Sequence, residues 1–188
     1  MVSEQKKNIR HLIKELKNKE DKKTWKSRSE KIFSHITSLD CFKNAKSILA
    51  FWSLPDEVIT TSFIAEWHHK KNIYLPVVNG NDLRIVKFEG ENTLIAEQKF
   101  GILEPSSSIE VEIRDIDLAI IPGVAFDSKC NRLGRGKGYY DRLLKESVAI
   151  KIGVCFDFQI VAAVPTESFD IPLDLVVAES AAYIPKNQ

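Results

Sequence analysis

A glycine-rich run at residues 131–141, NRLGRGKGYYD, carries the residue types best suited to chemistry in this sequence. It places Gly134, Gly136 and Gly138 at alternate positions, with Arg135 and Lys137 between them. Glycine lets a backbone approach a ligand closely and turn its N–H groups toward it. Arginine and lysine add donors and positive charge suited to phosphate. We therefore predict a polyphosphate-binding site, with a nucleotide-using enzyme as the leading interpretation.

Two familiar phosphate-binding motifs do not fit this run. Lys137 is followed by Gly138 and not by Ser or Thr, which excludes a Walker A loop, and the glycine spacing is not that of a dinucleotide fingerprint. A tight glycine turn with surface charges is the alternative, and three alternate glycines around two cations argue against it. The run lies between a predicted buried strand and a predicted helix, where open α/β sheets bind ligands.

Acidic and aromatic residues elsewhere in the chain can complete such a site. Asp141 falls in the first turns of the predicted helix, where it either compensates the helix dipole or binds Mg²⁺. Asp170 is a candidate second carboxylate, although an acid in a turn is the simpler interpretation. Asp56 and Glu57 follow the strand that ends at Trp52. That indole can stack on a flat heterocycle or pack in the core, and Glu57 can accept from ring N–H groups or remain solvated.

The rest of the sequence alternates between helical and strand patterns. Helices are predicted over most of the first forty residues, over about 60–71 and over 137–146. Strands are predicted over 47–52, 72–76, 83–88 (an exposed or edge strand), 117–121, 149–156, 173–178 and 182–184. Residues 89–116, which include Gly101, are predicted to form loop and short helical pieces. Such alternation predicts an α/β sandwich around a largely parallel sheet, within one domain spanning residues 1–188.

Composition narrows the function classes. The chain has 188 residues, a net charge of +1 and no long apolar run, so neither a membrane protein nor a chain-wide nucleic-acid binder is expected. Three widely spaced cysteines indicate reduced thiols in a cytoplasmic protein. Residues 1–31 are basic, with 11 Lys and Arg against 5 Asp and Glu. They form either a solvated helix or a segment that folds over an anionic ligand.

These motifs together resemble the 5-formyltetrahydrofolate cyclo-ligases, also called 5,10-methenyltetrahydrofolate synthetases. The resemblance rests on PGVAFD at 122–127 and on the run 131–142, which is long and specific. Three shorter features support it: Lys6-x-x-x-Arg10, WSLPDEV at 52–58, and DIPLD at 170–174. The fold that it implies is the three-layer α/β/α architecture shared with ribose-5-phosphate isomerases and CoA transferases, with a basic helical N-terminal segment of about residues 1–38 packed over the nucleotide site.

The resemblance also implies a reaction and a set of roles. The reaction is the ATP- and Mg²⁺-dependent closure of 5-formyltetrahydrofolate to 5,10-methenyltetrahydrofolate, with release of ADP and phosphate, by a cytoplasmic monomer without nucleic-acid or membrane partners. Arg135, Lys137 and Tyr139 would be catalytic. The nucleotide would be held by Lys6, Arg10, Arg132, Leu133, Gly134, Arg135, Gly136, Lys137, Gly138, Tyr139 and Tyr140. The folate would contact Trp52, Glu57 and residues 135–139, and Mg²⁺ would bind Asp141 and Asp170.

Two departures and two alternatives accompany this interpretation. Cys130 stands where many members have a loop glycine, and Trp52 is bulkier than the usual aliphatic residue. One alternative is a sugar-phosphate isomerase or CoA-transferase-like relative, which would need no ATP. The paired cations Arg135 and Lys137 argue against it, because they suit a larger ligand than such an enzyme would bind. A nucleic-acid-binding module using the basic N-terminal segment is opposed by the acidic remainder of the chain.

Overall fold

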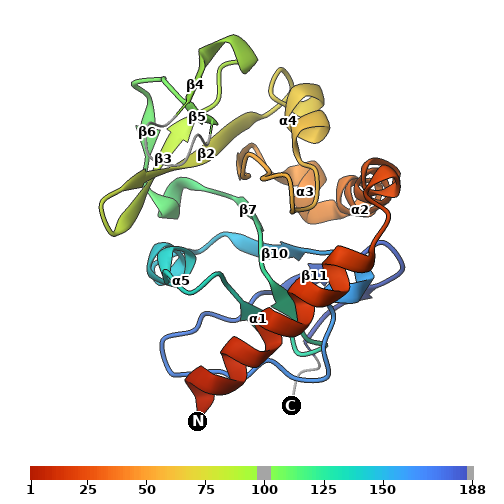
Figure 1. Ribbon diagram of the computed structural model, residues 1–188. Helices are drawn as coiled ribbons and strands as arrows, with labels where there is room; N and C mark the ends of the chain where they lie inside the picture. Colours follow the sequence, from red (N-terminus) through yellow and green to blue (C-terminus); the bar gives the residue numbers. More distant parts are fainter. Residues whose placement is uncertain (97–102, 186–188) are drawn as a thin grey trace.

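A computed structural model describes residues 1–96 and 103–185 and shows a twisted eight-stranded sheet between two layers (Figure 1). Strands β11, β10, β7, β1 and β2 run parallel, and β12, β3 and β6 pair antiparallel with their neighbours. In spatial order the strands are β12 (Ala182–Tyr183), β11 (Leu175–Val177), β10 (Ile150–Val154), β7 (Leu118–Ile121), β1 (Ser47–Leu49), β2 (Asn72–Asn79), β3 (Asp82–Lys87) and β6 (Glu110–Val111).

Helices cover both faces of this sheet. One face packs against α2 (Trp25–Ser38), α3 (Asp40–Asn44) and α4 (Thr61–Trp67), and the other against α5 (Tyr139–Leu144) and nearby loops. The central strand β7 shows why both layers are needed. All four of its residues are buried, with Ile120 in one core and Ile121 in the other, as expected of a parallel strand covered on both sides. The predicted three-layer α/β/α fold is confirmed.

Helix α1 (Val2–Lys19) belongs to neither layer and crosses in front of the sheet (Figure 1). The spacing of Ile9, Leu12, Ile13 and Leu16 predicts one apolar stripe. Leu12 is exposed, whereas Ile13 is fully buried with Ile9 and Leu16 beside it. These side chains pack against a small antiparallel hairpin formed by β8 (Ala125–Phe126) and β9 (Arg132–Leu133). The helix is therefore attached to the segment that precedes the glycine-rich run.

The order of the strands creates one crevice. From β1 the chain passes through α4 to β2 on one side, whereas from β7 it continues to β10 on the other. The boundary between β1 and β7 is a topological switch point, where open α/β sheets bind ligands beyond the carboxyl ends of their strands. Residues 51–57 follow β1. Pro122, the β8–β9 hairpin and the glycine-rich run follow β7.

Several element predictions were wrong in extent. The helix predicted to reach about residue 71 ends at Trp67, whose carbonyl accepts from the N–H groups of Lys70 and Lys71. Strand β3 is partly exposed over its first three residues, as one of the two predicted alternatives requires, but it is not the edge of the sheet, because β6 pairs with its outer side. Residues 89–116 also contain β4 (Leu94–Ala96) and β5 (Leu103–Pro105), which are too short to leave a periodic pattern. Gly101 lies in 97–102, outside the described residues.

Candidate active site

A cavity of about 500 Å³ occupies the switch point. Strands β2, β3 and β5 give it apolar residues, including Leu75, Val78, Leu83 and Leu103, whereas α1 and the glycine-rich run give it cations. Its lining includes every site residue predicted from the sequence: Lys6, Arg10, Trp52, Glu57, Asp170 and all ten residues from Arg132 to Asp141. A single concave surface therefore combines an apolar wall with five cationic side chains.

Two of the three glycines of the run are required by its backbone. Gly136 has φ 100° and Gly138 has φ 68°, conformations that strain any residue with a Cβ atom. At Gly134 the conflict is steric, because a Cβ atom there would lie 2.8 Å from Nη1 of Arg132. The glycine pattern therefore has two causes: a left-handed backbone at Gly136 and Gly138, and the close approach of the Arg132 guanidinium at Gly134.

Arg132 lies buried at the base of the cavity. Its Nη2 donates to Asp141 Oδ1 at 2.8 Å, and its guanidinium lies over the Tyr140 ring at 5.6 Å. Its Nε is buried and has no hydrogen-bond partner among the described residues. Because an unpaired buried donor costs about 1–3 kcal/mol, this N–H favours an anionic ligand in the cavity. Burial, with the charge of Glu57 adding to it, raises the pKa of the Tyr140 phenol, which therefore stays protonated.

Helix α1 brings two cations to the cavity from the far end of the sequence. Lys6 Nζ lies 2.6 Å from Asp170 Oδ2 and 2.9 Å from Glu167 Oε2. Arg10 Nε donates to the Gly134 carbonyl at 2.9 Å. Burial alone would lower the pKa of Lys6, but the hydrogen bonds that Lys6 donates to the two carboxylates, and their negative charges, outweigh it and raise that pKa. The lysine therefore carries its charge at neutral pH.

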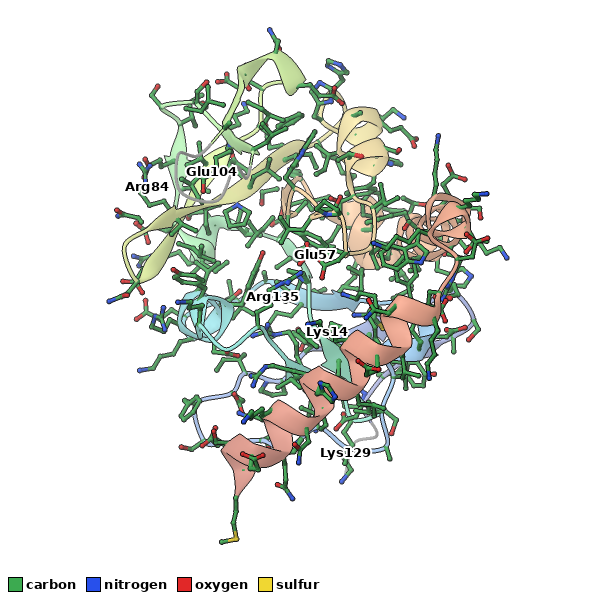
Figure 2. The ribbon with its side chains drawn as sticks, viewed as in Figure 1. Lys14, Glu57, Arg84, Glu104, Lys129 and Arg135 are labelled. Atoms are coloured by element: carbon green, nitrogen blue, oxygen red, sulfur yellow. The ribbon has the colours of Figure 1, made fainter. Side chains whose placement is uncertain are left out.

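Arg135 and Glu57 lie side by side in the middle of the molecule (Figure 2). Arg135 Nη2 lies 3.0 Å from Glu57 Oε1 and 2.7 Å from Asp56 Oδ1. The segment that follows β1 is thereby joined to the glycine-rich run. Trp52, near the start of that segment, is half-buried, and its ring centroid lies 5.7 Å from that of Phe88.

Tyr139 and Lys137 are fixed by the turn between β2 and β3. The Tyr139 hydroxyl donates to the Gly80 carbonyl at 3.3 Å. Arg142 lies over the Tyr139 ring at 5.5 Å, donates to the Lys137 carbonyl at 3.1 Å and pairs with Asp82 at 2.9 Å. Sequence reasoning assigned no role to Arg142, although it ends the motif that carries the resemblance.

Asp127 is a further residue that sequence reasoning did not single out. It is buried, and its carboxylate accepts from the backbone N–H groups of Lys129, Asn131 and Val164 at 2.9–3.0 Å and from the Asn131 side chain at 3.0 Å. The local signal was available, because an acid that accepts from the next few N–H groups is typical of a turn. It holds the β8–β9 turn that leads to the glycine-rich run.

Cys130 adopts the left-handed conformation, with φ 62°. The backbone there follows a path that favours glycine, at a cost of about 1–2 kcal/mol for another residue. Its buried thiol donates to the Tyr183 carbonyl at 3.1 Å, and burial raises its pKa to about 11. All three cysteines are free, as predicted, and this one is an unreactive structural thiol.

Two carboxylates proposed for a metal, Asp141 and Asp170, line the cavity and are each paired with a cation. No cluster of three or more metal-binding side chains occurs within residues 1–96 and 103–185. Glu104, which also lines the cavity and was not predicted, accepts from the Val78 N–H at 3.2 Å (Figure 2). Mg²⁺ in phosphate-transfer sites needs only one or two carboxylates with phosphate oxygens and water, so this sparse set fits it.

The model of the 5-formyltetrahydrofolate cyclo-ligase family matches residues 2–179, nearly the whole of the described chain. The chain belongs to this family. It is 33% identical to the 5-formyltetrahydrofolate cyclo-ligase of Haemophilus influenzae over 157 residues, which cover 79% of this chain and 84% of that protein. It is 32% identical to the Escherichia coli K12 enzyme of the same name over 152 residues, 74% of this chain and 81% of the relative.

Solved structures agree with this membership. The 5,10-methenyltetrahydrofolate synthetase of Aquifex aeolicus superimposes with a TM-score of 0.87 at 33% identity, over 97% of this chain and 94% of the other. The synthetase from Mycoplasma pneumoniae, at 23% identity and a TM-score of 0.73, supports the fold alone. The cyclo-ligase family consists of enzymes, so the chain is a ligase of folate one-carbon metabolism. In the part of the chain that the structure describes, no helix has the length and apolarity needed to span a membrane.

Proposed function

We propose that this cyclo-ligase closes 5-formyltetrahydrofolate to 5,10-methenyltetrahydrofolate with Mg²⁺ and ATP, releasing ADP and phosphate. The observation that carries the proposal is the single cavity with a cationic side and an apolar side. Phosphates suit the first and a flat heterocycle suits the second. A volume of about 500 Å³ is typical of a small-molecule site.

The phosphates would be held by cations that two carboxylates now neutralise. Lys6 is paired with Asp170, and Arg132 with Asp141. If Asp170 and Asp141 held Mg²⁺, Arg132 could bind phosphate oxygens, which would also give its unpaired Nε an acceptor. Lys6 would keep Glu167 as a partner and could bind phosphate with its remaining donors. Bound Mg²⁺ would withdraw charge from the phosphate oxygens. Arg10, held by the Gly134 carbonyl, adds a further cation.

The folate would lie against the apolar side. Trp52 would stack on the pterin, and Glu57 would accept from ring N–H groups. The formyl group is an amide, whose carbon is a poor electrophile and whose oxygen is a poor leaving group. Transfer of the γ-phosphoryl group to that oxygen removes both obstacles: the second nitrogen attacks the carbon, loses its proton and displaces phosphate. Arg135 and Lys137 would stabilise charge on the moving phosphoryl group, and Tyr139 would contact both ligands.

A direct assay tests this function. The purified protein is mixed with 5-formyltetrahydrofolate and Mg-ATP, and the methenyl product is followed by its absorbance. We expect product only when both ATP and Mg²⁺ are present. Lys137→Ala should abolish turnover while leaving the circular dichroism spectrum unchanged. Lys145→Ala, which alters an exposed lysine just beyond α5, is the matched control. A folded wild-type protein that yields no product would contradict the proposal.

A further inference from the structure

A chain of charged residues links α1 to Arg135 from outside the cavity. Lys17 Nζ donates to Asp56 Oδ2 at 2.9 Å and to the Asp56 backbone carbonyl at 2.7 Å. The other carboxylate oxygen, Oδ1, accepts from Arg135 Nη2 at 2.7 Å. Neither Lys17 nor Asp56 lines the cavity. One carboxylate therefore bridges a helix cation and a proposed catalytic cation.

This contact differs from an ordinary surface ion pair. The Lys17 side chain is 16% exposed and bonds both the carboxylate and the main chain of one residue. By contrast, in the pair Lys43–Asp40 the lysine is 58% exposed. Burial alone would raise the pKa of Asp56, but hydrogen bonds from Lys17 and Arg135 outweigh it and lower that pKa. The bridge is therefore fully charged at neutral pH.

Arg135 needs side-chain partners because its own backbone gives it little restraint. It lies between Gly134 and Gly136, and its side chain is half-exposed. Its Nε and Nη2 are bound on the side of Asp56 and Glu57. Because a guanidinium is a rigid plane, fixing two of its nitrogens also fixes the third. Glu57 is itself tied to the Leu54 N–H at 3.1 Å, so both partners come from one segment.

We propose that Asp56, held in place by Lys17, is a positioning residue that orients Arg135 toward the transferred phosphoryl group. The assignment rests on the proposed function. Lys17 shares the charge of Asp56, so this carboxylate orients Arg135 while a second cation partly offsets its charge. Helix α1 thereby acts on the reacting group through a residue outside the cavity, in addition to the cations that it places inside.

The first test needs no catalysis. The Arg135 Nε–H signal in a ¹H–¹⁵N spectrum, assigned by its loss in Arg135→Lys, reports how the guanidinium is held. Asp56→Asn and Lys17→Met should each shift or broaden this signal. Asp40→Asn and Lys43→Met, which alter the exposed pair Lys43–Asp40, should leave it in place. An Arg135 signal that neither Asp56→Asn nor Lys17→Met moves would overturn the inference, whatever the protein catalyses.

The second test separates positioning from stability. Asp56→Asn and Lys17→Met should each lower kcat on the order of ten-fold and leave the KM for ATP near its wild-type value. The double variant should be no slower than the slower single variant, because both act through Arg135. Asp56→Glu should restore part of the rate. Additive losses, or losses that follow the melting temperature, would overturn the inference. Wild-type protein that makes no product yet shows the signal shifts would contradict only the proposed function.

Discussion

At the scale of single residues, the course of the backbone into the cavity depends on Asp127. It lies outside the cavity wall, yet its four hydrogen bonds fix both the β8–β9 turn and the segment at Val164. Each of its two carboxylate oxygens accepts two of these hydrogen bonds. The same turn carries the strained Cys130, whose conformation the carboxylate helps to impose.

Asp127→Ala should lower the free energy of unfolding by about 3 kcal/mol or more, because several buried N–H groups lose a charged acceptor at once. Urea unfolding followed by tryptophan fluorescence measures the change. Asp127→Asn retains one acceptor oxygen and should lose less. A loss below about 1 kcal/mol in the alanine variant would show that other groups or water satisfy those donors.

The sequence reveals some of these residues and hides others for a physical reason. The glycine-rich run is visible because its backbone demands are local, as the φ angles of Gly136 and Gly138 show. Lys6 and Arg10 were found only through the resemblance, since two cations four positions apart on a helix are ordinary. Lys17 and Asp56 pair across 39 positions, and such a pair leaves no local spacing to read.

At the scale of elements, α1 is the part whose role changes most between sequence and structure. From its basic composition alone, α1 could be a plain solvated helix. In the structure it contributes Ile13 to a small core and Lys6 and Arg10 to the cavity wall. It also contributes Lys17 to the Asp56 bridge. The sheet strands were easier to predict, because runs such as 118–121 are apolar throughout. Strand β6 has only two residues, which is too short for an alternating pattern to predict it.

The double variant Lys6→Met, Arg10→Met should weaken ATP binding at least about ten-fold, equivalent to about 1.4 kcal/mol, and weaken folate binding less. The methionines keep the helix and its apolar stems while removing the charge. Calorimetric titration of each ligand measures both affinities, and Lys7→Met, on an exposed position of the same helix, is the control. Stronger loss of folate than of ATP binding would contradict the placement of phosphates beside α1.

At the scale of the whole molecule, ion pairs join segments that are distant in sequence, and we propose that the chain folds as one unit. Two of these pairs set the pH range over which the segments stay joined. The pKa of Asp56 is lowered from its usual 3.8, so its contribution to stability is present above that value and is lost as the pH falls through the folded-state pKa. The pKa of Lys6 is raised from 10.5, so its contribution is present below that value and is lost at higher pH.

The stability difference between wild type and Asp56→Asn should therefore be constant from about pH 5 to 9. It should begin to shrink below about pH 4 and disappear only below the folded-state pKa of Asp56. The difference for Lys6→Met should persist over the same range and shrink only as the pH rises beyond about 10.5. Urea unfolding in a series of buffers gives both curves. A difference for Asp56→Asn that grows with acidity would mean that its carboxylate is not charge-paired in the folded protein.

The contact between Lys6 and Asp170 also has a consequence for synthesis. The two residues are 164 positions apart, and a ribosome adding roughly 5–20 residues per second needs on the order of ten to thirty seconds to pass from one to the other. Throughout most of that interval Lys6 has neither of its carboxylate partners, although Lys17 of the same helix can already pair with Asp56. Under the proposed function, a chain released before residue 170 would lack Asp170, one of the two proposed Mg²⁺ ligands and a partner of Lys6.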